Sequence, residues 1–188
     1  MFCHAVPRGS VLNVAHPRNS DADMPIDFEP IENGFMETLR PHPAFAGWRK
    51  KRKRCLWRKV GDVEQGVELI RYKDSFENRQ RVSLGLYVSV PDEREWPGYV
   101  PTEIWHKGRL YRRAYLVPNQ GLVDDNSFAS GALIALSSEE ELAAWLATLA
   151  ADIDPHVAPW FKQYETLEAA SYEYEIPRWR NVSASQPR

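Results

Sequence analysis

The stretch "RVSLGLYVSV", residues 81–90, decides the fold. Apolar side chains alternate there with small or polar ones, and this period of two is typical of a β-strand. The apolar set is Val82, Leu84, Leu86, Val88 and Val90. The intervening set is Ser83, Gly85, Tyr87 and Ser89. We therefore expect a central strand that buries one face in a core and leaves its other face partly open.

Four further segments have the composition of strands. They are "CLWRKV" (55–60), "VEQGVELIRY" (63–72), "RLYRRAYLV" (109–117) and the short "GALIAL" (131–136). The pair Gly61-Asp62 predicts a tight turn between the first two segments, and the prolines and glycine between 91 and 108 predict a long loop. Since short turns join antiparallel neighbours, we expect a sheet of four to five antiparallel strands.

Helical periodicity occurs at both ends of the chain. In "PIDFEPIENGFMETL" (25–39) apolar residues recur three and four positions apart, and "RPHP" (40–43) ends this helix because proline cannot extend it. Two more apolar stripes follow near the C-terminus, and Asp154-Pro155 is expected to separate their helices. The first stripe is Leu142, Trp145, Leu146, Leu149 and Ile153, and the second is Val157, Trp160, Phe161, Tyr164 and Leu167.

Together these elements predict an α+β fold, in which an antiparallel β-sheet of four to five strands is packed on one face by an N-terminal helix and two C-terminal helices. With 188 residues, of which 43% are hydrophobic, the chain is long enough for a single domain with its own core. We expect this domain to cover residues 25–175. The polar composition of residues 1–24 predicts a disordered N-terminal tail, and residues 176–188 are expected to form a loose C-terminal tail.

Composition also indicates the compartment. No apolar run approaches the ~20 residues of a membrane span, and the N-terminus lacks the apolar segment of a signal peptide. The two cysteines, Cys3 and Cys55, are too few for a disulfide scaffold. The sequence therefore predicts a cytoplasmic protein that does not bind a membrane.

Three segments carry a resemblance to a known family. They are "GWRKKRKRCLWRKVGDV" (47–63), "RVSLGLYVSV" (81–90) and "ALIALSSEEELAAWL" (132–146), in which Ser138 and Glu141 have the spacing of a helix capping box. Over roughly residues 28–168 the chain resembles the bacterial domain-of-unknown-function family numbered 4304. It departs from that family where "SGALIAL" lacks the expected tryptophans. The resemblance implies an α+β fold in the bacterial cytoplasm and implies no activity.

No metal or cofactor motif is present. The five histidines are scattered, and none lies at ligand spacing from a cysteine or a carboxylate. The stretch Asp124-Asp125-Asn126 could offer oxygen ligands to a hard cation, but we favour an Asx-type turn there. We therefore expect no metal and no cofactor.

Support for an enzyme is also weak. Neighbouring cations would lower the pKa of the Cys55 thiol, yet the bulky Leu56 and Trp57 beside it indicate a buried structural cysteine. Glu103 and His106 could form an acid–base pair, but only if the chain is helical at that point of the long loop. The sequence leans against an enzyme.

A basic run is the most unusual feature. Eight basic residues and no acid lie from Arg49 to Lys59, and a second basic group lies within 107–113. Because alternate side chains of a strand point to opposite faces, the run from Arg49 to Arg54 cannot form a regular buried strand and must occupy an edge, a turn or a bulge. With the flanking tryptophans it forms a candidate binding surface of Trp48, Arg49, Lys50, Lys51, Arg52, Lys53, Arg54, Trp57, Arg58 and Lys59.

This surface admits several interpretations. A solvated edge or hairpin tip would need no ligand at all. As a binding surface it suits a protein partner with an acidic surface, for example in a toxin–immunity system, because arginine and tryptophan are common in interface hot spots. Nucleic acid is the alternative, since tryptophan can stack on bases while cations bind phosphates, but the net charge of −2 disfavours it. A third reading is an enzyme of unknown class, with its site between the sheet and the loop at 91–108.

Overall fold

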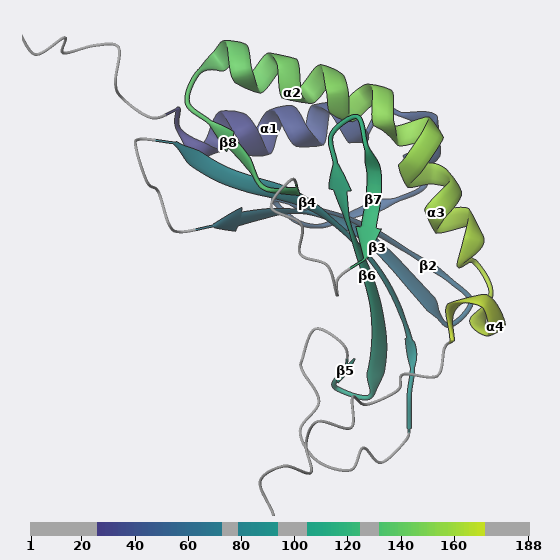
Figure 1. Ribbon diagram of the computed structural model, residues 1–188. Coiled ribbons are helices and arrows are strands. Elements are labelled where there is room, and N and C mark those ends of the chain that lie inside the picture. Colours follow the sequence, from purple (N-terminus) through teal and green to yellow (C-terminus); the bar gives the residue numbers. More distant parts are fainter. Residues whose placement is uncertain (1–25, 73–78, 94–104, 125–131, 172–188) are drawn as a thin grey trace, which may run out of the picture.

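A curved antiparallel sheet with helices on one side forms the body of the protein (Figure 1). This computed structural model describes residues 26–72, 79–93, 105–124 and 132–171. The predicted α+β class with an antiparallel sheet is therefore confirmed.

The sheet has eight strands within the described residues, more than the four to five predicted. They are β1 (Arg49–Arg52), β2 (Cys55–Val60), β3 (Val63–Tyr72), β4 (Gln80–Pro91), β5 (Trp105–His106), β6 (Arg109–Val117), β7 (Gly121–Asp124) and β8 (Ile134–Leu136). Six follow the order β1-β2-β3-β4-β6-β5, while β7 pairs with β6 and β8 pairs with β4. The prediction missed β1, which is entirely basic, and β5 and β7, which are too short to show a period.

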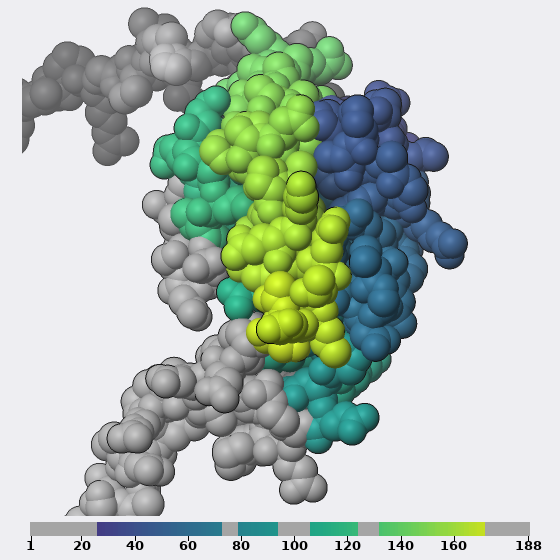
Figure 2. Space-filling view, turned by 90° about the vertical axis from the view of Figure 1, so that its right-hand side faces the viewer, coloured from purple at the N-terminus to yellow at the C-terminus, as the bar shows by residue number. Residues whose placement is uncertain are grey.

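The helices are α1 (Phe28–Leu39), α2 (Glu139–Asp152), α3 (Ala158–Gln163) and α4 (Leu167–Ala170), together with the 3-10 turn η1 (Pro43–Phe45) and the π-helical turn η4 (Ile153–Val157). In Figure 2 the lime-to-yellow surface of the C-terminal helices runs beside the purple-to-blue surface of α1 and the first strands. Among the described residues, no helix has both the length and the apolar character needed to cross a membrane. The predicted tails, 1–24 and 176–188, lie outside the described ranges.

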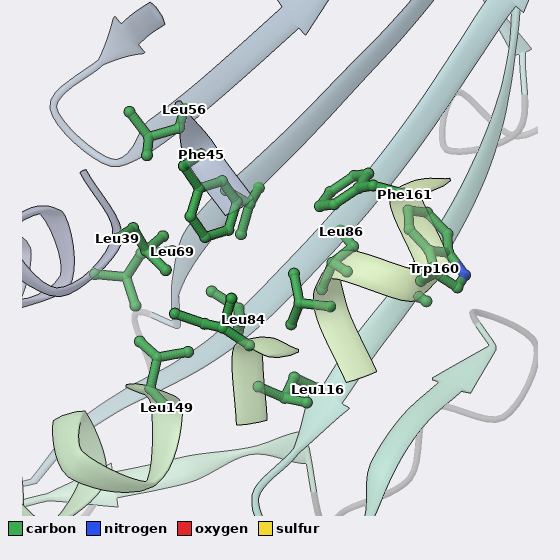
Figure 3. Packing of buried hydrophobic residues seen from close by; sticks show 14 of the residues in the cluster. Leu39, Phe45, Leu56, Leu69, Leu84, Leu86, Leu116, Leu149, Trp160 and Phe161 are labelled. Atoms are coloured by element: carbon green, nitrogen blue, oxygen red, sulfur yellow. The ribbon is translucent and has the colours of Figure 1, made fainter. Parts of the chain in front are cut away.

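The main core lies between the helices and the face of the sheet that carries the apolar set of β4. Leu84 and Leu86 are each 1% exposed, and Figure 3 shows them packed near Leu149 of α2 and Phe161 of α3. The predicted contact between the central strand and the helical stripes is therefore confirmed. At about 1.5–3 kcal/mol for each large apolar side chain buried, this layer is the main source of stability.

The second face of β4 is also buried, and the prediction of a partly open face is wrong. Ser83 and Ser89 are fully buried. The hydroxyl of Tyr72 lies 3.1 Å from that of Ser83, and Arg109 donates a 3.0 Å hydrogen bond to the hydroxyl of Ser89. Because the small residues on this face leave room, large side chains from the neighbouring strands lie over them, which a single-strand pattern cannot reveal.

The predictions for the buried face of α1 and for the N-terminal cap of α2 are largely confirmed. Helix α1 buries Ile31, Phe35, Met36 and Leu39, as its periodicity predicts. At the start of α2, the Glu141 N–H donates to the hydroxyl of Ser138 at 3.2 Å, which is one half of the predicted capping box. The carboxylate of Glu141 instead accepts from the N–H and the hydroxyl of Ser137, at 2.7 and 2.8 Å.

The C-terminal helices differ from the prediction at two points. The chain stays helical through Asp154-Pro155 as the π-helical turn η4. Pro155 has no N–H to donate, and the wider spacing of a π-helix accommodates the missing hydrogen bond. Leu167 is 47% exposed rather than part of the apolar stripe. The reason is that α3 ends at Gln163 and Tyr164 leaves the helical conformation, so the helical period is interrupted before Leu167.

Candidate functional site

The basic run lies at the edge of the sheet. Arg49–Arg52 form β1, the last strand on its side, and Lys53 and Arg54 make the turn into β2. All side chains from Arg49 to Lys53 are exposed. The pairing register with β2 shifts between Lys50 and Arg52, as in a bulge. The prediction that the run occupies an edge, a turn or a bulge is confirmed.

Three of the ten candidate residues make contacts within the protein, on the helical side of the sheet. They are Trp48, Arg54 and Arg58. Arg58 lies 2.8 Å from the carboxylate of Glu165, and its guanidinium sits 5.1 Å from the ring centroid of Trp48. Trp48 packs against Phe45 and Phe161, with ring centroids 5.1 and 4.9 Å apart. These contacts join the first strands to the C-terminal helices.

Arg54 is engaged in a similar way. Its guanidinium lies 3.5 Å from the carboxylate of Glu32 and 5.6 Å from the ring centroid of Phe28, both in α1. Lys50 also faces this side, since it borders a shallow hollow against Met36 and Arg40. The structure therefore does not bring all ten candidates to one surface.

Five of the other six candidates gather on the opposite side of the sheet, and Lys53 lies in the exposed turn between β1 and β2. We call Arg49, Lys51, Arg52, Trp57 and Lys59 the cationic face. Arg49 is the cross-strand partner of Trp57, and the ammonium of Lys51 lies 5.2 Å from the centroid of that ring. Lys59 is exposed two residues beyond Trp57 and so shares its side of β2.

A pocket of about 200 Å³ adjoins the cationic face. Its walls are Lys51, Arg52, Cys55, Glu68, Tyr87, His106, Tyr111 and Arg113. These residues come from both ends of the six-strand path, β1 and β5. In a flat sheet five strand spacings of about 4.8 Å would separate those ends by roughly 24 Å, so the sheet must curl toward this side. We call this hollow the β1–β5 pocket.

A tyrosine over a glycine forms part of the pocket wall. Gly66 and Tyr87 are cross-strand partners, and a Cβ atom on Gly66 would lie 2.1 Å from the tyrosine ring. The absence of a side chain at Gly66 therefore lets the ring lie across β3. In that position the Tyr87 hydroxyl is 3.9 Å from the sulfur of Cys55.

Both of these polar groups stay neutral at ordinary pH. Burial raises the pKa of the Cys55 thiol, and the nearby Glu68 carboxylate adds to that increase. Burial also raises the pKa of Tyr87, with a further contribution from Cys55. A thiol held in its protonated form is a poor nucleophile. The arrangement therefore favours a structural role for Cys55, with Tyr87 as a hydroxyl donor in the pocket wall.

The charge of the pocket is positive. Lys51, Arg52 and Arg113 contribute three cations against the single carboxylate of Glu68. The Nε of Arg113 is buried and has no hydrogen-bond partner in the described part of the chain. A pocket with this lining is suited to hold a small anion.

The structure describes the side chain of one of the candidate residues from the loops. His106 is exposed and borders the pocket, whereas Glu103, Asp125 and Asn126 lie outside the described residues. No three His, Cys, Asp or Glu side chains within the described ranges are grouped as metal ligands. The sequence analysis did not assign Glu68, Tyr87, Tyr111 and Arg113 to a site. The sequence feature that could have indicated the pocket is the second basic group, at 107–113, which includes Arg113.

Comparison of the chain with protein-family models, with curated proteins and with solved structures finds no match. The resemblance to family 4304 therefore stays a prediction, and function must be argued from the geometry of this chain alone.

Proposed function

We propose that this protein is a non-catalytic binding protein, and that its cationic face binds another protein through an acidic surface. One contrast within the basic run carries the proposal. Arg54 and Arg58 are paired with carboxylates of the same chain, whereas Arg49 to Lys53 are exposed and form no ion pair with any described carboxylate. The chain thus places its acids beside some cations of the run and leaves the neighbouring ones open to a partner.

The geometry of the open cations supports an interface. Arg49, Lys51 and Arg52 lie on an edge strand and share their side of the sheet with the ring of Trp57, and a large ring between cations is a typical interface anchor. Complementary charge would speed the encounter with an acidic partner. A protonated, buried Cys55 gives no support to nucleophilic catalysis at the adjoining pocket.

Nucleic acid remains the alternative, and two observations weigh against it. The ring of Trp48 is enclosed by Phe45, Phe161 and Arg58, and its indole N–H is buried, so it offers no open platform for a base. Stacking of single-stranded bases needs exposed aromatic faces. The net charge of −2 also disfavours a polyanion.

The wider context is part of the same proposal. We infer a cytoplasmic location, since Cys55 is a free thiol and such thiols are usual in reducing compartments. A toxin–immunity system of the kind expected from the sequence would supply an acidic partner. Membership of family 4304 would be compatible with this role, because that family carries no assigned activity.

Binding of labelled probes tests the proposal. We expect a fluorescent peptide rich in Asp and Glu to bind the full chain in a salt-sensitive manner, and we expect the double variant Arg49→Glu/Arg52→Glu to bind it at least about tenfold more weakly. Lys162→Glu is the matched control for the single variants Arg49→Glu and Arg52→Glu, because it reverses one exposed cation on α3. Equal binding by the double variant and the control would overturn the proposal. A single-stranded oligonucleotide that binds more tightly than the peptide would favour the alternative.

A further inference from the structure

We propose that the β1–β5 pocket is a subsite for one carboxylate group, and that Arg113 is its main donor. The inference rests on the proposed function, because an acidic side chain of the partner would supply that carboxylate. It adds a position, a ligand chemistry and a donor outside the basic run.

The size of the pocket favours one functional group over a whole organic ligand. Sites for drug-sized molecules and cofactors usually measure about 300–1,000 Å³. The β1–β5 pocket measures about 200 Å³, and a water molecule occupies about 30 Å³ in the liquid. The tip of one acidic side chain, with a few waters, fits this volume.

Arg113 provides the donor. Of the three cations in the lining, Arg113 is half-buried, whereas Lys51 and Arg52 are exposed. Its guanidinium lies 5.9 Å from the ring centroid of Tyr111, a contact that satisfies no N–H. A guanidinium binds a carboxylate through two parallel hydrogen bonds, and such a pair is stronger where water is partly excluded. A carboxylate in the pocket would therefore bind Arg113 more strongly than it binds the two exposed cations.

The surrounding charges favour a small anion. Lys51 and Arg52 border the pocket from β1, and Glu68 of β3 is the carboxylate in its lining. Three cations against one carboxylate attract an anion, and repulsion from Glu68 reduces that attraction. Under the proposed function the anion is the side chain of Asp or Glu, because these are the anions of an acidic protein surface.

Acetate and inorganic phosphate are the probes. Thermal unfolding of the full chain is followed as each anion is added, with sodium chloride holding the ionic strength constant. We expect acetate to raise the melting temperature in a saturable way, because a ligand that binds the folded state stabilises it. No saturable effect of acetate, or a stronger effect of phosphate, would overturn the carboxylate assignment.

Two substitutions should move the affinity in opposite directions. Arg113→Gln should weaken acetate binding about tenfold or more, since a charged hydrogen bond contributes about 1.5–3 kcal/mol. Glu68→Gln removes the repulsive charge and should strengthen acetate binding. Lys162→Gln, an equal change of charge on α3, should leave it unchanged. A Glu68→Gln variant that binds acetate more weakly than the native chain would contradict the pocket geometry.

The remaining design separates this inference from the proposal on which it rests. Arg52→Gln serves as a second test if Arg113→Gln does not fold, because Arg52 lies on the exposed edge strand. We expect this variant to bind acetate more weakly. If the acidic peptide binds while acetate shows no saturable effect, the pocket assignment fails alone. If acetate binds at the pocket while the peptide does not bind, the protein-partner proposal fails and the carboxylate subsite stands.

Discussion

Gln65, on β3, donates a 2.7 Å hydrogen bond from its side-chain amide to the main-chain carbonyl of Phe161 in α3. The same amide nitrogen donates to the carbonyl of Tyr164 at 3.1 Å, and the amide oxygen accepts from Nε of Arg58 at 2.8 Å. The side chain is fully buried on the helical side of the sheet. Gln65 thus caps the C-terminal end of α3, where the Phe161 carbonyl also accepts from the Tyr164 N–H at 3.2 Å.

Gln65→Leu tests this connection. The substitution keeps the volume but removes the Gln65 partner of the Tyr164 carbonyl and of the Arg58 Nε–H, while the Phe161 carbonyl keeps the Tyr164 N–H. We expect the free energy of unfolding, measured by urea denaturation, to fall by about 2–4 kcal/mol, since each orphaned buried group costs roughly 1–3 kcal/mol. Gln163→Leu, at an exposed position of α3, should change it by less than about 0.5 kcal/mol. Similar losses in both variants would show that the buried amide has no special role.

Gly66→Ala should destabilise the fold through Tyr87. The added methyl group would overlap the tyrosine ring, and that ring is held by Cys55 and Tyr111. Overpacking of this kind typically costs about 1–3 kcal/mol. In a Tyr87→Ala background the same glycine substitution should cost much less, which a double-mutant cycle with urea denaturation measures. An undiminished cost in that background would place the strain elsewhere.

The Cys55 thiol should be slow to react. Burial raises its pKa, so little thiolate forms at pH 8, and the side chain is only 5% exposed. In a Cys3→Ser background, which leaves one thiol, we expect a disulfide reagent to modify the folded chain at least about tenfold more slowly than the chain in denaturant. Equal rates for the folded and the denatured chain would contradict the buried, protonated state.

The same shift predicts a loss of stability in alkali. Above the usual thiol pKa of 9.0 the unfolded chain releases the Cys55 proton while the folded chain keeps it. The unfolded state then binds fewer protons, so the free energy of unfolding falls as pH rises from about 9. Cys55→Ala should flatten this fall in urea titrations at several pH values. The slope that remains would reflect Tyr87, whose pKa is raised in the same direction.

The lowered pKa of Glu141 predicts that stability is lost in acid. Hydrogen bonds from the Ser137 N–H and hydroxyl lower the pKa of its carboxyl below the usual 4.5. The stability that the ionised group contributes is therefore present above pH 4.5 and lost as pH falls through the folded-state pKa. Glu141→Ala should lower the melting temperature at pH 7, with a difference from the native chain that narrows in acid. Glu140→Ala removes a carboxylate from the same helical turn and is the control variant.

Local patterns in the sequence determined most of the elements. The alternation at Val82 to Val90 and the helical spacing in α1 fix which side chains share a face, because the backbone geometry alone sets those periods. The cap at Ser138 was equally readable, since it depends on residues three apart. The basic run could be assigned to an irregular edge because no core accepts it.

The burial of the second face of β4 could not be read from that strand. Ser83 and Ser89 are small and polar, and they are buried because Tyr72 and Arg109 on other strands reach them. Likewise, nothing near Gly66 in the chain indicates the ring of Tyr87, which arrives by cross-strand pairing. Such contacts depend on the register between strands.

The sequence by itself thus determined the α+β class, the central strand and an exposed basic edge, because these follow from periods and charges within a few residues. Only the tertiary structure decided which cations are neutralised and where an anion could be held. Glu32 reaches Arg54 from α1, Glu165 reaches Arg58 from the segment between α3 and α4, and Arg113 joins the edge cations through the curl of the sheet. The physical reason is that electrostatic pairing depends on distance in space, which strand register and helix packing fix.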